Sequence, residues 1–145
     1  MVNPIAENIY PTCRNLVAAY QLVLPGETAR SHRHSPNALR LILDAGTDTF
    51  TIVNGVQIDV APGDVVLTPS WHWHGHSNFG NEPAFWIDFL DVPLVQNLEC
   101  MYFEDHPERN EAVVAHEPDS RLRHKGVELD RGSREKGVVD IAPGE

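Results

Sequence analysis

Histidines are the side chains of this sequence most able to do chemistry, because their spacing is unusual for a chain of 145 residues. Eight are present, and five of them recur at every second position in two short clusters: His32, His34, His72, His74 and His76. Neutral imidazole is the commonest nitrogen ligand for transition metals in proteins. Two such clusters in one small domain indicate a metal site more readily than a chance His-x-His pair on a surface strand.

The spacing within the clusters limits which imidazoles can share a metal. Side chains two residues apart in an extended segment lie on the same face, so His32 and His34 can point to one place. The second cluster has a single parity as well, and only one or two of its members can reach that place. Spacing alone leaves the third ligand open among His72, His74 and His76.

Short strands must position these side chains. Alternating or apolar runs recur between turns rich in Gly, Pro and Asn, which predicts an all-β sandwich or barrel. Asn54-Gly55 joins two alternating runs and is a strong hairpin signal, since both residues tolerate positive φ. The predicted strands are 16–24, 39–43, 49–53, 56–60, 65–68, 71–77 and 85–90.

The chain changes character after the last of these strands. Apolar residues from 93 to 103 follow an i, i+3/i+4 pattern with Pro93 in the first turn, which predicts one amphipathic helix closing the barrel. Residues 1–15 show no clear period and are expected to form an arm. Residues 106–145 are polar and charged, so we expect an extended or poorly ordered tail there. The folded domain is therefore predicted to span residues 16–105.

Composition excludes several classes of function. The formal net charge is −10, whereas a nucleic-acid partner requires a basic face. The longest apolar stretch, about six residues, is too short to span a membrane. We expect no signal peptide, and Cys13 and Cys100 alone predict no disulfide scaffold. A cytoplasmic protein that binds neither nucleic acid nor membranes is therefore expected.

Two segments resemble the two halves of the cupin signature. Residues 26–34, GETARSHRH, contain a glycine, five residues and then His-x-His. Residues 63–78 contain a glycine, five residues, a proline and then His74. The resemblance implies a double-stranded β-helix, that is, a jelly-roll barrel. It also implies His74 as the third metal ligand beside His32 and His34.

Longer stretches resemble the amino-terminal cupin of gentisate 1,2-dioxygenases and of the related salicylate and 1-hydroxy-2-naphthoate dioxygenases. They are HRHSPNALRLIL and PGDVVLTPSWHWHGHSNFGNEPAFWIDFLDVPLVQNLE, and the likeness covers roughly residues 16–105. It implies a homo-oligomeric Fe(II) enzyme that opens the ring of a small aromatic carboxylate, a hydroxybenzoate, with O2. Cupins in general carry a glutamate soon after His-x-His, but residues 35–40 contain no carboxylate. Three neutral ligands leave coordination positions for substrate and O2.

The resemblance further implies roles for side chains around the metal. Arg40 matches an inward arginine that would clamp the substrate carboxylate, with a surface charge as the alternative. His76 matches a histidine that hydrogen-bonds substrate or oxygen, unless it lies at the rim and contacts water. Gln21 matches an active-site glutamine, although an outward position fits nearly as well. Asp88 lies in an apolar strand, where a carboxylate needs a partner, so we expect Arg40, a histidine or the substrate beside it.

Other aromatic and histidine side chains have simpler expected roles. The three tryptophans could stack on an aromatic substrate, but core packing is the simpler expectation for each: Trp71, Trp73 and Trp86. Three further histidines lie in the predicted tail and are not expected at the metal: His106, His116 and His124.

Two other functions compete with the ring-cleaving dioxygenase. One is a non-catalytic metal- or ligand-binding cupin, such as a sensor or storage module. The other is a small-cupin enzyme that acts on a non-aromatic substrate. The joint presence of Arg40, His76 and Asp88 with three histidine ligands favours the dioxygenase, because a bare binding module has no need of that set.

Overall fold

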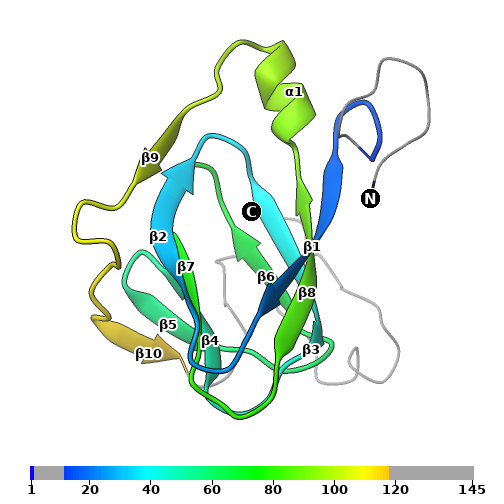
Figure 1. The fold of residues 1–145 in the computed structure, drawn as a ribbon. Coiled ribbons are helices and arrows are strands. Elements are labelled where there is room, and N and C mark those ends of the chain that lie inside the picture. Colours follow the sequence, from blue (N-terminus) through cyan, green and yellow to red (C-terminus); the bar gives the residue numbers. More distant parts are fainter. Residues whose placement is uncertain (2–11, 118–145) are drawn as a thin grey trace, which may run out of the picture.

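A computed structural model of the chain describes residue 1 and residues 12–117. Two β-sheets face each other and form a jelly-roll barrel (Figure 1). The strands are β1 (Val17–Val23), β2 (Thr28–His34), β3 (Ala38–Asp44), β4 (Thr49–Val53), β5 (Val56–Asp59), β6 (Val65–Thr68), β7 (His74–Asn78), β8 (Ala84–Leu90), β9 (Phe103–Asp105) and β10 (Ala115–Glu117). The one helix in the described part is α1 (Val92–Asn97). The predicted all-β barrel with one short helix is confirmed.

The strands divide unequally between the two sheets. The four-stranded sheet has the order β1-β8-β3-β6, and the six-stranded sheet has the order β10-β5-β4-β7-β2-β9. Crossing between sheets at successive turns places β2 beside β7, although 39 residues separate the end of one from the start of the other along the chain. Both histidine-bearing strands therefore lie in the six-stranded sheet.

Turn residues explain where the chain reverses. Asn54 and Gly55 adopt φ of 47° and 78°, the left-handed pair that a two-residue hairpin turn requires. This turn joins β4 to β5, as the sequence predicts. Gly63, at φ 89°, makes the turn that precedes β6.

The barrel interior is apolar in one part and polar in another. The apolar part is a cluster around the buried Trp86: Val23, Ile42, Val60, Val66, Ala84 and Trp86. On the inner faces of β3 and β8, the register pairs Ile42 with Trp86. Two residues further along each strand, it pairs Arg40 with Asp88. The sequence of β3 and β8 thus provides an apolar base and, beside it, a region of buried polar side chains, here called the chamber.

The helix is shorter than predicted. The i, i+3/i+4 pattern predicts a helix from 93 to 103, but α1 ends at Asn97. Glu99 adopts φ 59°, which breaks the helix, and Phe103–Asp105 pairs with β2 as β9. Edge pairing with a distant strand overrides the local helical pattern.

The folded body continues past the predicted boundary at residue 105. Ala115–Glu117 pairs in parallel with β5 as strand β10. The segment before it is held by polar contacts: Glu111 accepts a hydrogen bond from Gly55 N at 2.6 Å, and its own N donates to Ser31 Oγ at 3.0 Å. Because these contacts are polar, the segment has no apolar periodicity from which the sequence could have revealed it. Residues 118–145 of the predicted tail, and most of the predicted arm, lie outside the described residues.

The described part of the chain contains no helix with the length and apolar content needed to cross a membrane.

Candidate metal centre

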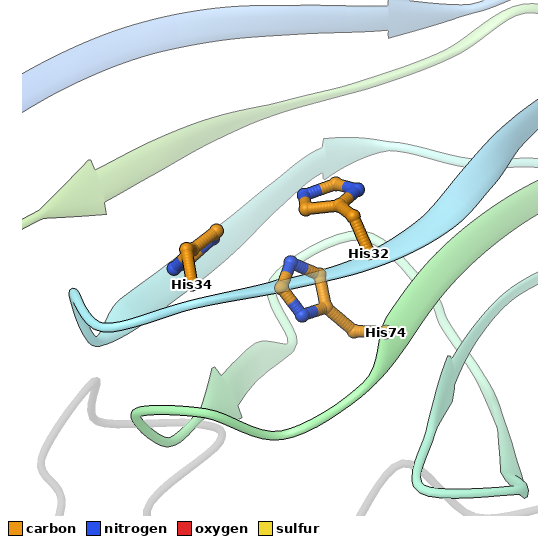
Figure 2. A group of neighbouring side chains, drawn as sticks. All are labelled: His32, His34 and His74. Carbon is orange, nitrogen blue, oxygen red and sulfur yellow. The ribbon is translucent and has the colours of Figure 1, made fainter. Parts of the chain in front are cut away.

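Three histidines from two strands converge inside the barrel. His32 and His34 lie two apart on β2, and His74, at the start of β7, is the cross-strand partner of His32. The three rings face one another (Figure 2), with centroids 4.4 to 5.5 Å apart. One nitrogen from each ring lies within 4.8 Å of the other two. With a small inward shift of the rings, imidazole nitrogens grouped in this way can bind one ion at the ~2.1 Å distance typical of metal–nitrogen bonds.

Backbone carbonyls determine which nitrogen of each ring is free. A carbonyl oxygen only accepts hydrogen bonds, so an Nδ1 that contacts one must carry the proton. The Nε2 of a neutral ring is then a bare lone pair, as a metal ligand requires. The acceptors are Arg30 O at 3.1 Å for His32, Pro36 O at 2.8 Å for His34 and His72 O at 2.9 Å for His74.

One buried nitrogen of the site has no hydrogen-bond partner, and a bound metal would be its partner. His74 Nε2 is buried and has no hydrogen-bond partner within the described structure, an arrangement that is costly for a polar atom. Burial, together with the positive charge of Arg40, lowers the pKa of His74 to about 2. Burial likewise lowers the pKa of His34. These two rings are therefore neutral at pH 7, and a three-nitrogen donor set suits a divalent transition metal.

A buried ion pair stands beside the histidines. Arg40 Nε lies 2.8 Å from Asp88 Oδ1, and the residues are 3% and 7% exposed. Arg40 Nη1 also donates to Thr68 Oγ1, and Trp86 Nε1 donates to Asp88 Oδ2 at 3.2 Å. Burial raises the pKa of Asp88, while the charge of Arg40 opposes that rise. The predicted partner of Asp88 is thus Arg40, and the surface alternative for Arg40 is wrong.

His76 lies two residues beyond His74 on β7 and is buried as well. It is 2% exposed, so the alternative of a rim position is wrong. Its Nδ1 lies 3.0 Å from Thr51 Oγ1, and its ring centroid is 5.0 Å from that of Trp86 and 6.2 Å from that of His74. Burial holds the pKa of His76 well below its ordinary value. The ring is therefore a neutral hydrogen-bonding group next to the metal site.

Gln21 and Trp86 lie on the inner face of the barrel, whereas Trp71 and Trp73 lie outside it. Gln21 lies directly opposite Trp86 in the β1–β8 register, which places it on the inner face rather than outward. Trp86 is 1% exposed and belongs to the core, as expected. Trp71 is 40% exposed, and Trp73 packs against His106 outside the barrel with ring centroids 4.7 Å apart. The core expectation is therefore wrong for these two side chains.

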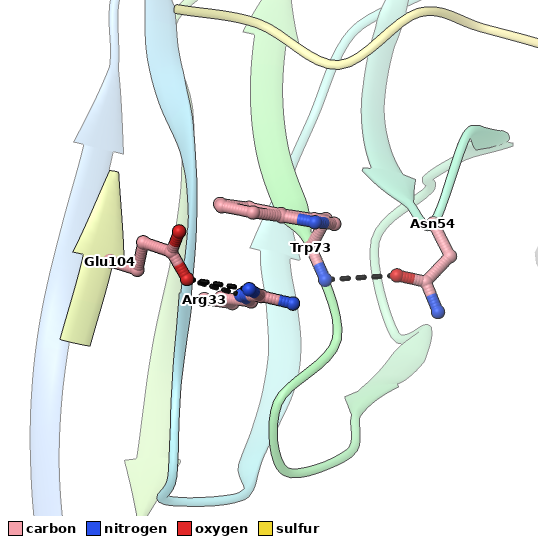
Figure 3. Close-up of polar contacts among 4 residues, drawn as sticks. All are labelled: Arg33, Asn54, Trp73 and Glu104. Atoms are coloured by element: carbon pink, nitrogen blue, oxygen red, sulfur yellow. Dashed lines mark hydrogen bonds and ion pairs between the residues drawn. The ribbon is translucent and has the colours of Figure 1, made fainter. Parts of the chain in front are cut away.

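The structure also reveals a cluster outside the barrel that sequence reasoning missed. The Arg33 guanidinium carbon lies 4.5 and 4.4 Å from the ring centroids of Trp71 and Trp73. Arg33 also donates to Glu104 Oε2 from Nε and Nη2, at 2.8 and 2.6 Å (Figure 3). Asn54 Oδ1 accepts from Trp73 N at 2.9 Å. This cluster joins the ligand strand β2 to the segment before β7. Strand parity places Arg33 on the face opposite His32 and His34, but it does not place the tryptophans beside it.

The other described histidines are not members of the three-ring group. His72 Nδ1 contacts Ser70 O at 3.0 Å, and His116 pairs with Asp59 Oδ2 at 2.9 Å on the surface. Neither these two nor His106 belongs to the metal-binding group found among the described residues. His124 lies outside the described residues.

Comparison with known proteins shows the same fold and related enzymes. The chain is 49% identical over 85 residues to a gentisate 1,2-dioxygenase from Ralstonia sp, covering 59% of this chain and 24% of that protein. It is 35% identical over 136 residues to gentisate 1,2 dioxygenase 1 from Aquipseudomonas alcaligenes, covering 94% of this chain and 39% of that protein. The chain therefore spans less than half the length of these relatives.

A solved structure agrees with the sequence matches. A salicylate 1,2-dioxygenase variant from Pseudoaminobacter salicylatoxidans, in complex with gentisate, superposes with a TM-score of 0.73. Its identity is 38%, and the match covers 86% of this chain and 35% of that one. Residues 19–92 match the cupin domain family. With the jelly-roll barrel and the converging histidines, this match over half of the sequence shows that the chain belongs to the cupin family.

Proposed function

We propose that this chain is an iron(II)-dependent dioxygenase that cleaves the aromatic ring of a hydroxybenzoate-type substrate, gentisate-like, with O2. The observation that carries the proposal is the donor set: three imidazoles without a carboxylate, next to a buried arginine. The relatives named as gentisate 1,2-dioxygenases, and the neighbouring structure with bound gentisate, support the same class of substrate.

His32, His34 and His74 would hold the iron. When bound, iron(II) supplies Lewis acidity toward the substrate oxygens and one-electron chemistry with O2. Three protein ligands leave positions for the carboxylate and hydroxyl of a chelating substrate. The carbonyl acceptors at the three Nδ1 atoms keep each Nε2 aimed at the ion, so the site is preorganised.

Arg40 would bind the substrate carboxylate. Its guanidinium has five N–H groups; Nη1 donates to Thr68, whereas the ion pair of Nε with Asp88 is not a hydrogen bond. Asp88 would hold the guanidinium in place and balance its charge while the chamber is empty of substrate. Arg40 lies close enough to the metal ligands for its charge to lower the pKa of His34 and His74.

His76 and Gln21 would contact the reacting groups. His76 engages Thr51 through Nδ1, which leaves Nε2 for a hydrogen bond to substrate or oxygen. Its low pKa keeps the ring neutral, so it adds no charge to the chamber. Gln21 shares the inner face with Trp86, and its amide can donate or accept.

The experiment that tests the proposal is anaerobic loading with iron(II), followed by oxygen uptake and ring-fission absorbance with gentisate, salicylate and 1-hydroxy-2-naphthoate. We expect turnover of at least one of these acids. Stoichiometric iron without turnover of any would favour the alternative, a non-catalytic metal- or ligand-binding cupin. Hydroquinone, which is gentisate without the carboxylate, is the control substrate.

The carboxylate role of Arg40 has its own test. Arg40→Lys should raise KM for the acid about 10- to 100-fold, the usual value of a charged hydrogen-bonded contact, and should change KM for hydroquinone little. Arg14→Ala, at an exposed position, should change neither. Equal effects on both substrates would contradict a carboxylate clamp.

A cytoplasmic location is also proposed. Cys13 and Cys100 are both free, which fits a reducing compartment.

A further inference from the structure

The ladder between the two ligand strands ends at the metal ligands themselves. The last registered pair of β2 and β7 is His32 with His74. Beyond that pair the end of β2 pairs with β9, and residues 71–73 come before β7 begins. Ladder hydrogen bonds between β2 and β7 therefore do not hold His34 beside His74, although both rings belong to the metal-binding group.

Residues 71–73 contact two of the ligands through their backbone. Trp71 N donates to His34 O at 2.9 Å, and His72 O accepts the hydrogen bond of His74 Nδ1 at 2.9 Å. Trp71 adopts φ 63°, a left-handed conformation that is unfavourable for a bulky side chain. Such a conformation persists only where the surrounding structure enforces it, so other contacts must hold this segment in place.

The side chain of Arg33 supplies such a contact. Its guanidinium carbon lies 4.5 and 4.4 Å from the ring centroids of Trp71 and Trp73, within the ~6 Å range of cation–π attraction. These two residues flank His72, whose carbonyl orients His74. We call Arg33, Trp71 and Trp73 the Arg33 stack. Two hydrogen bonds to Glu104 on β9 fix the guanidinium from its other end (Figure 3).

Trp73 is a fixed surface for the guanidinium. Its N donates to Asn54 Oδ1 at 2.9 Å, and its O accepts from Asn54 N at 2.9 Å. Asn54 belongs to the tight turn between β4 and β5, so this pair of hydrogen bonds ties Trp73 to a rigid hairpin. The Arg33 stack therefore joins β2 to an anchored residue directly before the ligand His74.

The contribution of Arg33 is mechanical rather than electrostatic. Strand parity places its side chain on the face opposite His32 and His34, and that side chain is 27% exposed. Arg40 is the arginine whose charge lowers the pKa of His34 and His74. Arg33 thus acts on the imidazoles through the backbone that carries them.

We propose that Arg33 is a positioning residue of the metal centre, which holds His34 and His74 at metal-binding distance by stacking on Trp71 and Trp73 outside the barrel. The inference rests on the proposed function in one respect, that the three histidines bind a divalent metal. It does not depend on ring cleavage or on the identity of the aromatic acid.

The test is titration of the metal-free full chain with Co(II), whose visible absorption responds to coordination geometry. Arg33→Met keeps the aliphatic stem and removes the guanidinium. It should raise the Co(II) Kd about 10- to 100-fold, the usual effect of removing a group that orients metal ligands, and should alter the Co(II) spectrum. Arg33→Lys should recover part of both, because an ammonium also stacks on indole but lacks the planar fork.

Two controls separate positioning from charge and from general stability. Arg14→Met makes the same charge change at an exposed position and should leave the Co(II) Kd unchanged. Val23→Ala removes packing in the apolar base, where Val23 is 4% exposed. It should lower the urea midpoint of unfolding but leave the Co(II) Kd and spectrum unchanged. If Arg33→Met fails to fold, Trp71→Leu, at a position 40% exposed, should raise Kd in the same direction.

The outcomes distinguish this inference from the proposed function. A parent chain that binds no Co(II) overturns the metal centre and the positioning role together. A parent chain that binds Co(II), with Arg33→Met and Trp71→Leu equal to it in Kd and spectrum, overturns the positioning role alone. An equal rise in Kd for Val23→Ala or Arg14→Met also overturns it, since stability or charge would then explain the loss.

Discussion

The buried pair of Arg40 and Asp88 permits a quantitative prediction. Asp88→Asn removes one charge from a pair whose atoms lie 2.8 Å apart and whose side chains are 4% and 9% exposed. Arginine stays protonated at neutral pH, so the variant leaves a buried cation without its counter-charge. Removing one partner of a buried pair costs about 3–5 kcal/mol. We expect the lower end, about 3 kcal/mol, because the asparagine oxygen can still accept a hydrogen bond.

A second substitution shows whether the unpaired charge causes the loss. Arg40→Met removes the cation but keeps much of its volume, so adding it to Asp88→Asn should restore part of the stability. The two changes should therefore be non-additive by about 2 kcal/mol or more, as for other contacting residues. The measurement is urea unfolding at pH 7 of the chelator-treated protein, because bound metal adds stability by mass action.

The matched control is Asp59→Asn. Asp59 pairs with His116, but both side chains are largely exposed, at 41% and 50%, so the loss should be about 0–1 kcal/mol. The reasoning is refuted if Asp88→Asn costs no more than Asp59→Asn, or if the effects of Asp88→Asn and Arg40→Met add within about 0.5 kcal/mol.

Three further predictions concern the metal strands. His74→Ala should weaken metal binding at least about a hundredfold, whereas His72→Ala, outside the ligand group, should leave metal binding unchanged. Elemental analysis measures the bound metal, and a fully metal-loaded His74→Ala protein would contradict the ligand assignment. Gly75→Ala would place a Cβ 2.7 Å from Ser31 Oγ and 3.2 Å from Ala29 O. Pushing β7 away from β2 should lower the free energy of unfolding in urea by about 1–3 kcal/mol. Gly46→Ala, whose Cβ would meet only Glu82 at 3.6 Å, is the control, and equal losses in the two variants would argue against crowding. In metal-free protein the pKa of His74 is about 2 in the folded state and about 6.5 in the unfolded state. The stability that the neutral ring contributes to the fold is therefore complete above pH 6.5 and is lost as the pH falls. Between pH 6.5 and 4.5 that loss is about 2 kcal/mol; His74→Gln should flatten the pH dependence of unfolding, and an unchanged slope would count against this linkage.

Local patterns predicted much of the barrel. The strands at 49–53 and 65–68 have the predicted bounds, and the Asn54-Gly55 turn lies where two left-handed residues are needed. These features depend on neighbouring residues only, which is why they can be read along the chain. The face shared by the histidines of each cluster is also a local feature, because it depends only on their spacing of two residues.

Pairings between distant segments escaped that reasoning. The helix expected from 93 to 103 ends at Asn97, because β9 joins the edge of β2. Strand β10 lies in a polar stretch, and it pairs with β5 through backbone groups that any residue possesses. Edge-strand pairing leaves little trace in side-chain pattern, so these elements could not be found from composition or period.

For the site, the sequence by itself determined which side chains are available and which face each takes. His32 and His34 share a face because they lie two apart, and the likeness to the cupin signature selects His74. Tertiary structure decided the rest: the carbonyls that expose each Nε2, the pairing of Arg40 with Asp88, and the stacking of Arg33 on Trp71 and Trp73. The physical reason is that parity is a property of one strand, whereas contacts between strands depend on a register that only the closed barrel establishes.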